Sequence, residues 1–179
     1  TVTDNSDNLT LTSTDADAAV GPNLRLYRNS SSPAVDDVLG VVEFEGRNNN
    51  SQDVIYAQYK TKVQSVTDGS EDCNFQISTM VAGTLRDRLS LNSNNTTFNE
   101  DSVDVDFRVE SNGNTHMLFV DGGNNKVGIG ESANAPMGTL HIKSADSGDT
   151  AIDGNNDDLV IENDNHAGIT ISTPNDKVG

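Results

Sequence analysis

The amino-acid sequence predicts an all-β protein, and three observations lead to this prediction. From Val103 to Glu110 apolar residues alternate with charged ones, and a period of two is typical of a strand with one buried face. Val and Ile total 25 residues against 11 Leu, a bias that favours pleated sheets over helices. No longer segment has apolar side chains at helical spacing, since the best candidate, Ala16 to Val20, is short and precedes Gly21-Pro22.

Read in chain order, the alternation predicts eleven core strands. The longest is expected from Val54 to Val66, with apolar side chains on one face and Gln and Lys side chains on the other. Clusters of Asn, Asp, Gly, Ser and Pro separate the strands, because these residues adopt turn conformations at low cost. The predicted strands are Leu24–Arg28, Val41–Glu45, Val54–Val66, Phe75–Val81, Leu85–Leu91, Val103–Val109, Leu118–Val120, Val127–Ile129, Leu140–Ile142, Leu159–Ile161 and Ile169–Ile171.

The same turn signals divide the chain into four parts. Residues 1–22 are polar and are expected to contain one short strand around Leu9 and Leu11. Residues 23–91 carry the longer strands, residues 92–101 form a polar linker, and residues 102–179 carry shorter strands. The sequence begins at Thr1 rather than Met and ends at Gly179 within a strand-and-turn unit. We therefore expect a truncated piece of a longer protein.

Charge and cysteine content exclude several classes of function. The chain has 28 acidic against 11 basic side chains, a net charge of -17, whereas nucleic-acid binding requires clustered Lys and Arg. No apolar stretch approaches the ~18 residues of a membrane span, so we expect neither nucleic acid nor membrane insertion. The lone Cys73 rules out an internal disulfide and favours assembly in a reducing compartment.

The composition also predicts that one chain cannot build a large core. Leu, Ile, Val and Phe total 41 of 179 residues, Trp is absent, and aromatic residues make up 4 %. Strands that offer two or three apolar residues each cannot enclose a core within residues 102–179. Such units need a partner, which is either a stack of repeats or identical chains that share one axial core.

Several segments resemble a known family. Val127–Gly130, a turn containing Pro136, and Thr139–Ile142 are together similar to a VGIG…P…LHI unit of bacteriophage tail fibres and tailspikes. Glu131 and a longer insert before Pro136 depart from the compact turn of that unit. Three further segments resemble strand-and-turn patterns of the same proteins: Phe107–Gly113, Leu118–Asp121 and the N-terminal module Leu24–Leu91.

The resemblance implies an elongated, parallel homotrimer of short-strand β-sandwich, β-prism or triple β-helix-like modules around an axial core. Such a fibre is a virion appendage, assembled in the host cytoplasm. It binds other tail or baseplate proteins and supports recognition of a host surface receptor, either a glycan or a protein. We therefore expect a structural tail fibre and not an enzyme. Two alternatives stay open: a secreted, calcium-stabilised bacterial adhesin or surface-layer module, and a polysaccharide depolymerase.

The sequence assigns no residue a catalytic or cofactor-binding role. Gly128-Ile129-Gly130 with Ala133 formally fits a dinucleotide fingerprint, which requires a helix directly after its glycines. Pro136 follows instead, so we interpret the glycines as residues that permit tight chain packing in a β-turn. Arg86 and Arg88 are expected in solvent or at a subunit contact.

Candidate metal ligands are similarly interpreted as solvated residues. Three carboxylate clusters lack the EF-hand spacing, and the three histidines are too far apart in sequence for a local site. His141 alternates with Leu140 and Ile142 and is expected on the surface. The alternative for both groups is an axial site in the trimer, holding Ca²⁺ or another cation. The clusters are Asp101, Asp104 and Asp106; Asp68, Glu71 and Asp72; and Asp121 with Asn124; the histidines are His116, His141 and His166.

Overall fold

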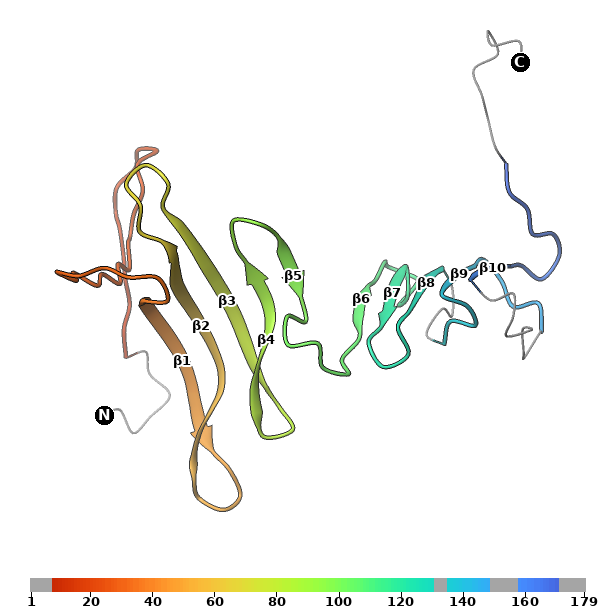
Figure 1. Ribbon diagram of the computed structural model, residues 1–179, viewed down its shortest axis with the longest axis horizontal. Coiled ribbons are helices and arrows are strands. Elements are labelled where there is room, and N and C mark those ends of the chain that lie inside the picture. Colours follow the sequence, from red (N-terminus) through yellow and green to blue (C-terminus); the bar gives the residue numbers. More distant parts are fainter. Residues whose placement is uncertain (1–7, 131–134, 149–157, 171–179) are drawn as a thin grey trace, which may run out of the picture.

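The computed structural model describes residues 8–130, 135–148 and 158–170, and these residues form ten strands and no helix. The all-β prediction is confirmed. Two five-stranded sheets lie one after the other along an elongated molecule (Figure 1). The described residues contain no helix that is long and apolar enough to cross a membrane. The strands are β1 (Val38–Arg47), β2 (Asp53–Ser65), β3 (Asp72–Val81), β4 (Thr84–Leu91), β5 (Thr96–Phe98), β6 (Phe107–Val109), β7 (Leu118–Asp121), β8 (Lys126–Gly130), β9 (Leu140–Lys143) and β10 (Leu159–Glu162).

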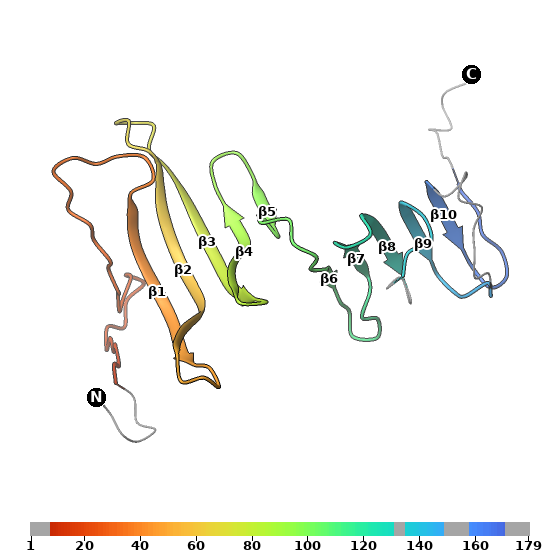
Figure 2. The ribbon, with the colours of Figure 1, turned by 60° about the horizontal axis from the view of Figure 1, so that its bottom comes forward.

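The first sheet is an antiparallel meander in the order β1-β2-β3-β4-β5 (Figure 2). Ala82 and Gly83, between β3 and β4, both have positive φ, 47° and 80°, which suits a two-residue hairpin turn. Between β1 and β2, Asn48 Oδ1 accepts hydrogen bonds from the N–H groups of Asn50 and Gln52 at 2.9 and 3.0 Å. Local turn chemistry therefore reverses the chain between neighbouring strands.

The second sheet is mixed, in the order β10-β9-β8-β7-β6. Strands β6, β7 and β8 pair antiparallel, whereas β8, β9 and β10 pair in parallel. The parallel register places Leu140 beside Val127 and Leu159 beside Leu140. Successive strands therefore stack in parallel and in register, as in a β-solenoid, and equivalent side chains form rows across the sheet.

Two sequence predictions between the sheets are wrong. The predicted strand Val103–Val109 is reduced to β6, because the Val105 N–H bonds to the Val103 carbonyl at 2.7 Å in a tight turn. The predicted linker, residues 92–101, contains β5, which pairs with β4. Asn92 makes this pairing feasible, since its Oδ1 accepts the N–H groups of Asn94 and Asn95 and turns the chain back.

The N-terminal strand predictions are also wrong. Leu24–Arg28 has no strand pairing, and residues 8–22 contain no strand around Leu9 and Leu11. Neither segment makes ladder hydrogen bonds with a neighbour in the described chain, and alternation alone does not form a strand without such a neighbour. At the other end, Ile169 and Thr170 are not in a strand, and Ile171 lies outside the described residues.

Candidate functional site

One face of the second sheet carries two unbroken rows of apolar side chains. The register aligns one residue from each of five strands in each row, because residues paired across a ladder point to the same face. No polar residue interrupts either row. We call these ten residues the apolar ladder: Phe107, Val120, Val127, Leu140 and Leu159 form one row, and Val109, Leu118, Ile129, Ile142 and Ile161 form the other.

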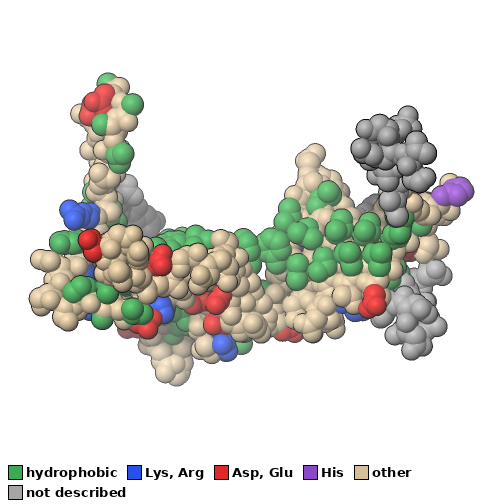
Figure 3. All heavy atoms as spheres, turned by 45° about the horizontal axis from the view of Figure 1, so that its top comes forward, with side chains coloured by type: hydrophobic (Ala, Val, Ile, Leu, Met, Phe, Trp, Pro, Cys, Tyr) green, Lys and Arg blue, Asp and Glu red, His purple; other side chains and the backbone are tan. Residues whose placement is uncertain are grey.

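The apolar face continues into the first sheet. Phe98 of β5 and Phe107 of β6 lie with their ring centroids 4.8 Å apart, so the rings join the two sheets. A further row crosses all five strands of the first sheet and leads to Phe98. Figure 3 shows the resulting band of hydrophobic side chains along the molecule. The row consists of Val42, Tyr59, Ile77, Leu89 and Phe98.

This apolar face is open to solvent in the single chain. Five ladder residues are 36 to 49 % exposed, and Phe98 is 55 % exposed. Among the described residues only two large hydrophobic side chains, Phe119 and Val160, are buried. The chain exposes 13377 Å², whereas a compact monomer of this mass would expose about 8,400 Å². An apolar surface of this extent marks an interaction site.

The opposite face of the first sheet is polar and internally hydrogen-bonded. Ser78, which is fully buried, donates from its hydroxyl to Asp87 Oδ1 at 2.6 Å and accepts from Gln58 Nε2 at 3.5 Å. Gln76 Nε2 donates to the other oxygen of Asp87. These cross-strand bonds satisfy polar groups that neighbouring side chains shield from water. The two faces of the sheet therefore differ sharply in chemistry.

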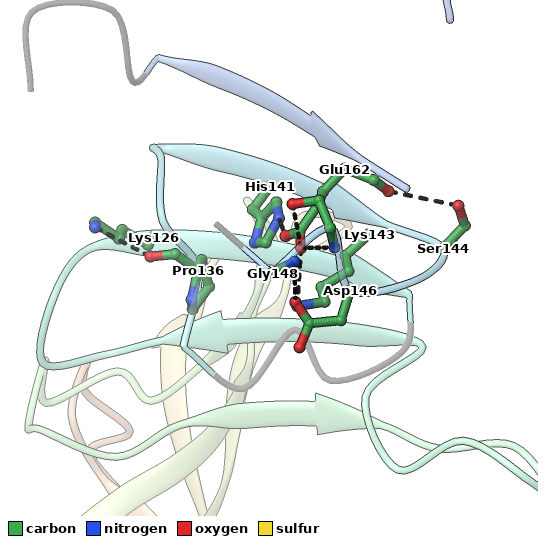
Figure 4. Close-up of polar contacts among 9 residues, drawn as sticks. Lys126, Pro136, His141, Lys143, Ser144, Asp146, Gly148 and Glu162 are labelled. Carbon is green, nitrogen blue, oxygen red and sulfur yellow. Dashed lines mark hydrogen bonds and ion pairs between the residues drawn. The ribbon is translucent and has the colours of Figure 1, made fainter. Parts of the chain in front are cut away.

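The corresponding face of the second sheet holds a buried ionic cluster on β9 and β10 (Figure 4). His141 Nε2 lies 2.9 Å from Glu162 Oε2, and both side chains are almost fully buried. Glu162 Oε1 lies 3.2 Å from Lys143 Nζ and accepts hydrogen bonds from the N–H and hydroxyl of Ser147 at 2.8 and 3.1 Å. The loop after β9 thus folds over the sheet and fixes the carboxylate from β10.

These contacts change the acidity of the charged members of the cluster. Burial by itself raises the pKa of Glu162, but hydrogen bonds from Ser147 and Lys143 outweigh burial, so this pKa lies below its usual 4.5. Burial by itself lowers the pKa of Lys143, but the adjacent Glu162 and Asp146 carboxylates raise it above 10.5. Both groups therefore remain charged at neutral pH and form an ion pair that links two parallel strands.

The prediction that His141 lies on the surface is wrong. It does point away from Leu140 and Ile142, but the loop that carries Ser147 covers this second face. Its Nδ1 atom is buried and has no hydrogen-bond partner in the described part of the chain. A signal was present in the sequence: Leu140-His141-Ile142-Lys143 and Leu159-Val160-Ile161-Glu162 match in pattern and end in opposite charges. Such a match favours parallel pairing.

Members of two carboxylate clusters meet beside the turn between β7 and β8, where Asp104 Oδ1 would lie 2.7 Å from a Cβ added to Gly123. Asp101 Oδ2 accepts the Asp87 N–H at 2.9 Å, and Asp106 Oδ1 accepts the Gly122 N–H at 3.1 Å. Asp121 accepts the Asn124 side-chain and backbone N–H groups, and these bonds lower its pKa. Within the described ranges no group of three or more His, Cys, Asp or Glu side chains is arranged to hold a metal ion.

The remaining candidate residues lie apart. His116 packs edge-on against Phe119 at 5.2 Å, whereas His166 is exposed beyond β10. Gly128 and Gly130 belong to β8, while Ala133 lies outside the described residues. Arg86 and Arg88 are half-buried on β4, and Cys73 is exposed at the start of β3.

A polar hollow of about 610 Å³ lies on the face of the second sheet opposite the apolar ladder. Asp106, Arg108 and Glu110 alternate along one wall, and His116 lies on another with Phe119. Arg108 Nη2 and Glu110 Oε1 form an ion pair at 2.6 Å within it. The hollow therefore presents charged, solvent-accessible groups, whereas the apolar ladder presents none.

No protein-family model matches this sequence, and no curated protein matches it either.

Proposed function

We propose that this chain is a shaft segment of a homotrimeric phage tail fibre, in which three copies bury their apolar faces against one another. The observation that supports the proposal is the apolar ladder, which runs across every strand of the second sheet and is exposed in the single chain. Burial of a Val, Leu, Ile or Phe side chain contributes roughly 1.5–3 kcal/mol. Self-association would supply the core that the single chain lacks.

The width of the ladder favours three copies around one axis. Residues i and i+2 of a strand are about 7 Å apart, so the ladder is a strip only two side chains wide. Three such strips enclose a narrow apolar prism in which each side chain contacts both neighbours. The polar face, with the ionic cluster and the charged hollow, then faces outward and keeps the fibre hydrated.

The difference between the two sheets favours parallel copies. Strands β1 to β4 have 8 to 13 residues, whereas β6 to β10 have 3 to 5. Antiparallel packing would oppose a wide sheet to a narrow one and leave apolar residues uncovered. Parallel packing places each sheet against the same sheet of the neighbouring copy.

The role of such a shaft is mechanical. It would hold a receptor-binding element at a distance from the tail and transmit the contact to other tail or baseplate proteins. The virion is therefore the proposed location, with a host surface glycan or protein as the receptor. No residue of the described chain is proposed to catalyse a reaction.

The first test is the mass of the purified chain, measured by size exclusion with light scattering. A species of three times 19.0 kDa is the expected result. A 19.0 kDa monomer that loses its fold with a calcium chelator would instead indicate the adhesin. Release of reducing ends from a capsular glycan would indicate the depolymerase.

Phe107→Asp should abolish this assembly, because it places a charge in the apolar ladder at the junction of the two sheets. The matched control is Arg108→Gln, which changes the adjacent, outward-facing residue of the same strand. Light scattering should report a monomer for the first variant and a trimer for the second. A normal trimer with Phe107→Asp would contradict the axial position of the ladder.

Strand direction can be tested by cross-linking between copies. In a Cys73→Ser background, Val42→Cys and Ile142→Cys each place one thiol on the apolar face, near opposite ends of the molecule. In a parallel assembly both variants should cross-link to themselves under a thiol-specific reagent. In an antiparallel assembly two residues this far apart along the molecule cannot both lie close to their counterparts in the other copy. Self-linking at only one position, or at neither, would therefore contradict the parallel arrangement.

A further inference from the structure

Strand β1 is the outer strand of the first sheet, and its outer edge makes no backbone pairing in the described chain. A free edge of ten residues is a template for pairing with another chain, and proteins normally cover such edges. The segment before β1 runs along this side of the sheet (Figure 2). We call its residues Leu24–Arg28 the arm segment. The arm segment is the part of the chain that lies closest to covering this edge.

The arm segment is already extended like a strand. The Arg25 guanidinium lies over the Tyr27 ring, 4.5 Å from its centroid, so these residues two positions apart share one side of the backbone. This is the side-chain alternation of a strand. The leucines on either side of Arg25 are exposed, Leu24 by 63 % and Leu26 by 51 %.

Two contacts align the arm segment with the edge of β1 in the antiparallel direction. Leu26 packs on Gly40 so closely that a Cβ on Gly40 would lie 2.9 Å from Leu26 Cδ1. Arg28 donates from Nη1 to the Val38 carbonyl at 3.1 Å and pairs through Nη2 with Asp37 at 2.7 Å. Residue 26 beside residue 40 fits an antiparallel ladder that continues with Leu24 beside Val42. The Arg28 contact with Val38 lies on the other side of the register shift that β1 shows between Val38 and Gly40.

We propose that the arm segment docks on the edge of β1 in its own chain as a sixth strand of the first sheet. In this register Leu24 extends the row that Val42 begins, and Leu26 lies over Gly40. Both leucines then join the apolar face. Leu26 lines a cavity of about 280 Å³ together with Val42, Tyr59 and Phe75. Docking of the arm segment closes this cavity.

Docking is coupled to assembly, and in this respect the inference rests on the proposed trimer. Fixing the backbone of one residue costs roughly 1–2 kcal/mol, and in the single chain one side of each leucine stays in water after docking. A neighbouring copy on the apolar face covers that side. Assembly therefore orders the arm segment, and the ordered arm covers the edge of β1.

Amide hydrogen exchange of the full chain, together with its mass in solution, tests the proposal. In the trimer the alternate amides of Leu24–Arg28 that point toward β1 should exchange about 100-fold more slowly than in an unstructured peptide. Gly40→Ala should remove this protection without changing the mass, because the added Cβ displaces Leu26. The matched control is Gly46→Ala, in the same strand, where the added Cβ meets only the Tyr56 ring at 3.3 Å; protection should persist.

The outcomes separate this inference from the proposed function. A trimer whose arm amides exchange as fast as in an unstructured peptide would overturn the docking and leave the fibre proposal standing. A trimer in which Gly40→Ala keeps full protection would overturn the register. A monomer would overturn the fibre proposal, and with it the coupling of docking to assembly.

Discussion

Gly130 shows how a single position can be fixed by its neighbours. It ends β8 with a φ of +107°, a conformation that L side chains rarely adopt, and an added Cβ would lie 1.9 Å from the Lys143 carbonyl oxygen. The glycine therefore lets β9 approach β8 at the point where the parallel stack begins. The sequence predicted a turn glycine here, but the reason for it lies in the adjacent strand.

Gly130→Ala should lower the free energy of unfolding by about 2–4 kcal/mol, because it combines backbone strain with a backbone collision. Gly113→Ala is the control, since no atom lies within 4 Å of the added Cβ. Thermal or denaturant unfolding measures both variants. Equal stability of the two would show that the backbone relaxes freely around β8.

At the scale of elements, the parallel pair β9 and β10 depends on charge as well as on apolar contact. Lys143 and Glu162 are direct partners in the ladder, and the Glu162 carboxylate also contacts His141 and Ser147. Because the pKa of Glu162 is lower in the folded chain than its usual value, the ionised carboxylate stabilises the fold above about pH 4.5. This contribution disappears as the pH falls through the folded-state pKa.

Glu162→Gln should therefore lower stability at pH 7 by about 1–3 kcal/mol, because it leaves the largely buried Lys143 with only the exposed Asp146 carboxylate, 3.5 Å from its Nζ, as a charge partner. The difference between wild type and variant should shrink as the pH falls below about 4.5. Melting temperatures of both proteins between pH 3 and pH 7 provide the measurement. A difference that stays constant over this range would exclude a role for the carboxylate charge.

At the scale of the whole molecule, the apolar face and the net charge act in opposite directions on assembly. Each chain carries -17, so a trimer would carry three times that charge, and self-repulsion opposes its compact state. The apolar face supplies the attraction. Within the described residues of one chain no group of three or more acidic side chains is arranged to hold a metal ion. Mobile salt screens the repulsion in any case.

Raising the salt concentration from about 0.05 M to about 0.5 M should stabilise the trimer, because the screening length shortens from roughly 14 to 4 Å. The measurement is the midpoint of dissociation on dilution or heating, and a chelator at constant ionic strength is the control for bound divalent cations. Weaker assembly at high salt would show that ion pairs between copies, rather than apolar contacts, hold them together.

The sequence by itself determined the strands of both sheets except β5, and which side chains share a face. Alternation in Val54–Val66 and Phe75–Val81 predicted the apolar and polar faces that the ladder between β2 and β3 displays. This success has a local cause, since a period of two fixes the face of every residue once a strand forms.

The tertiary structure decided which strands pair and what covers each face. His141 has a surface pattern but is buried, because a loop and Glu162 from β10 cover its side of the sheet. Thr96–Phe98 has a linker composition but forms β5, because β4 offers it an edge. Leu24–Arg28 has a strand pattern but no pairing. Burial and pairing depend on neighbours distant in sequence, and alternation within one segment carries no information about them.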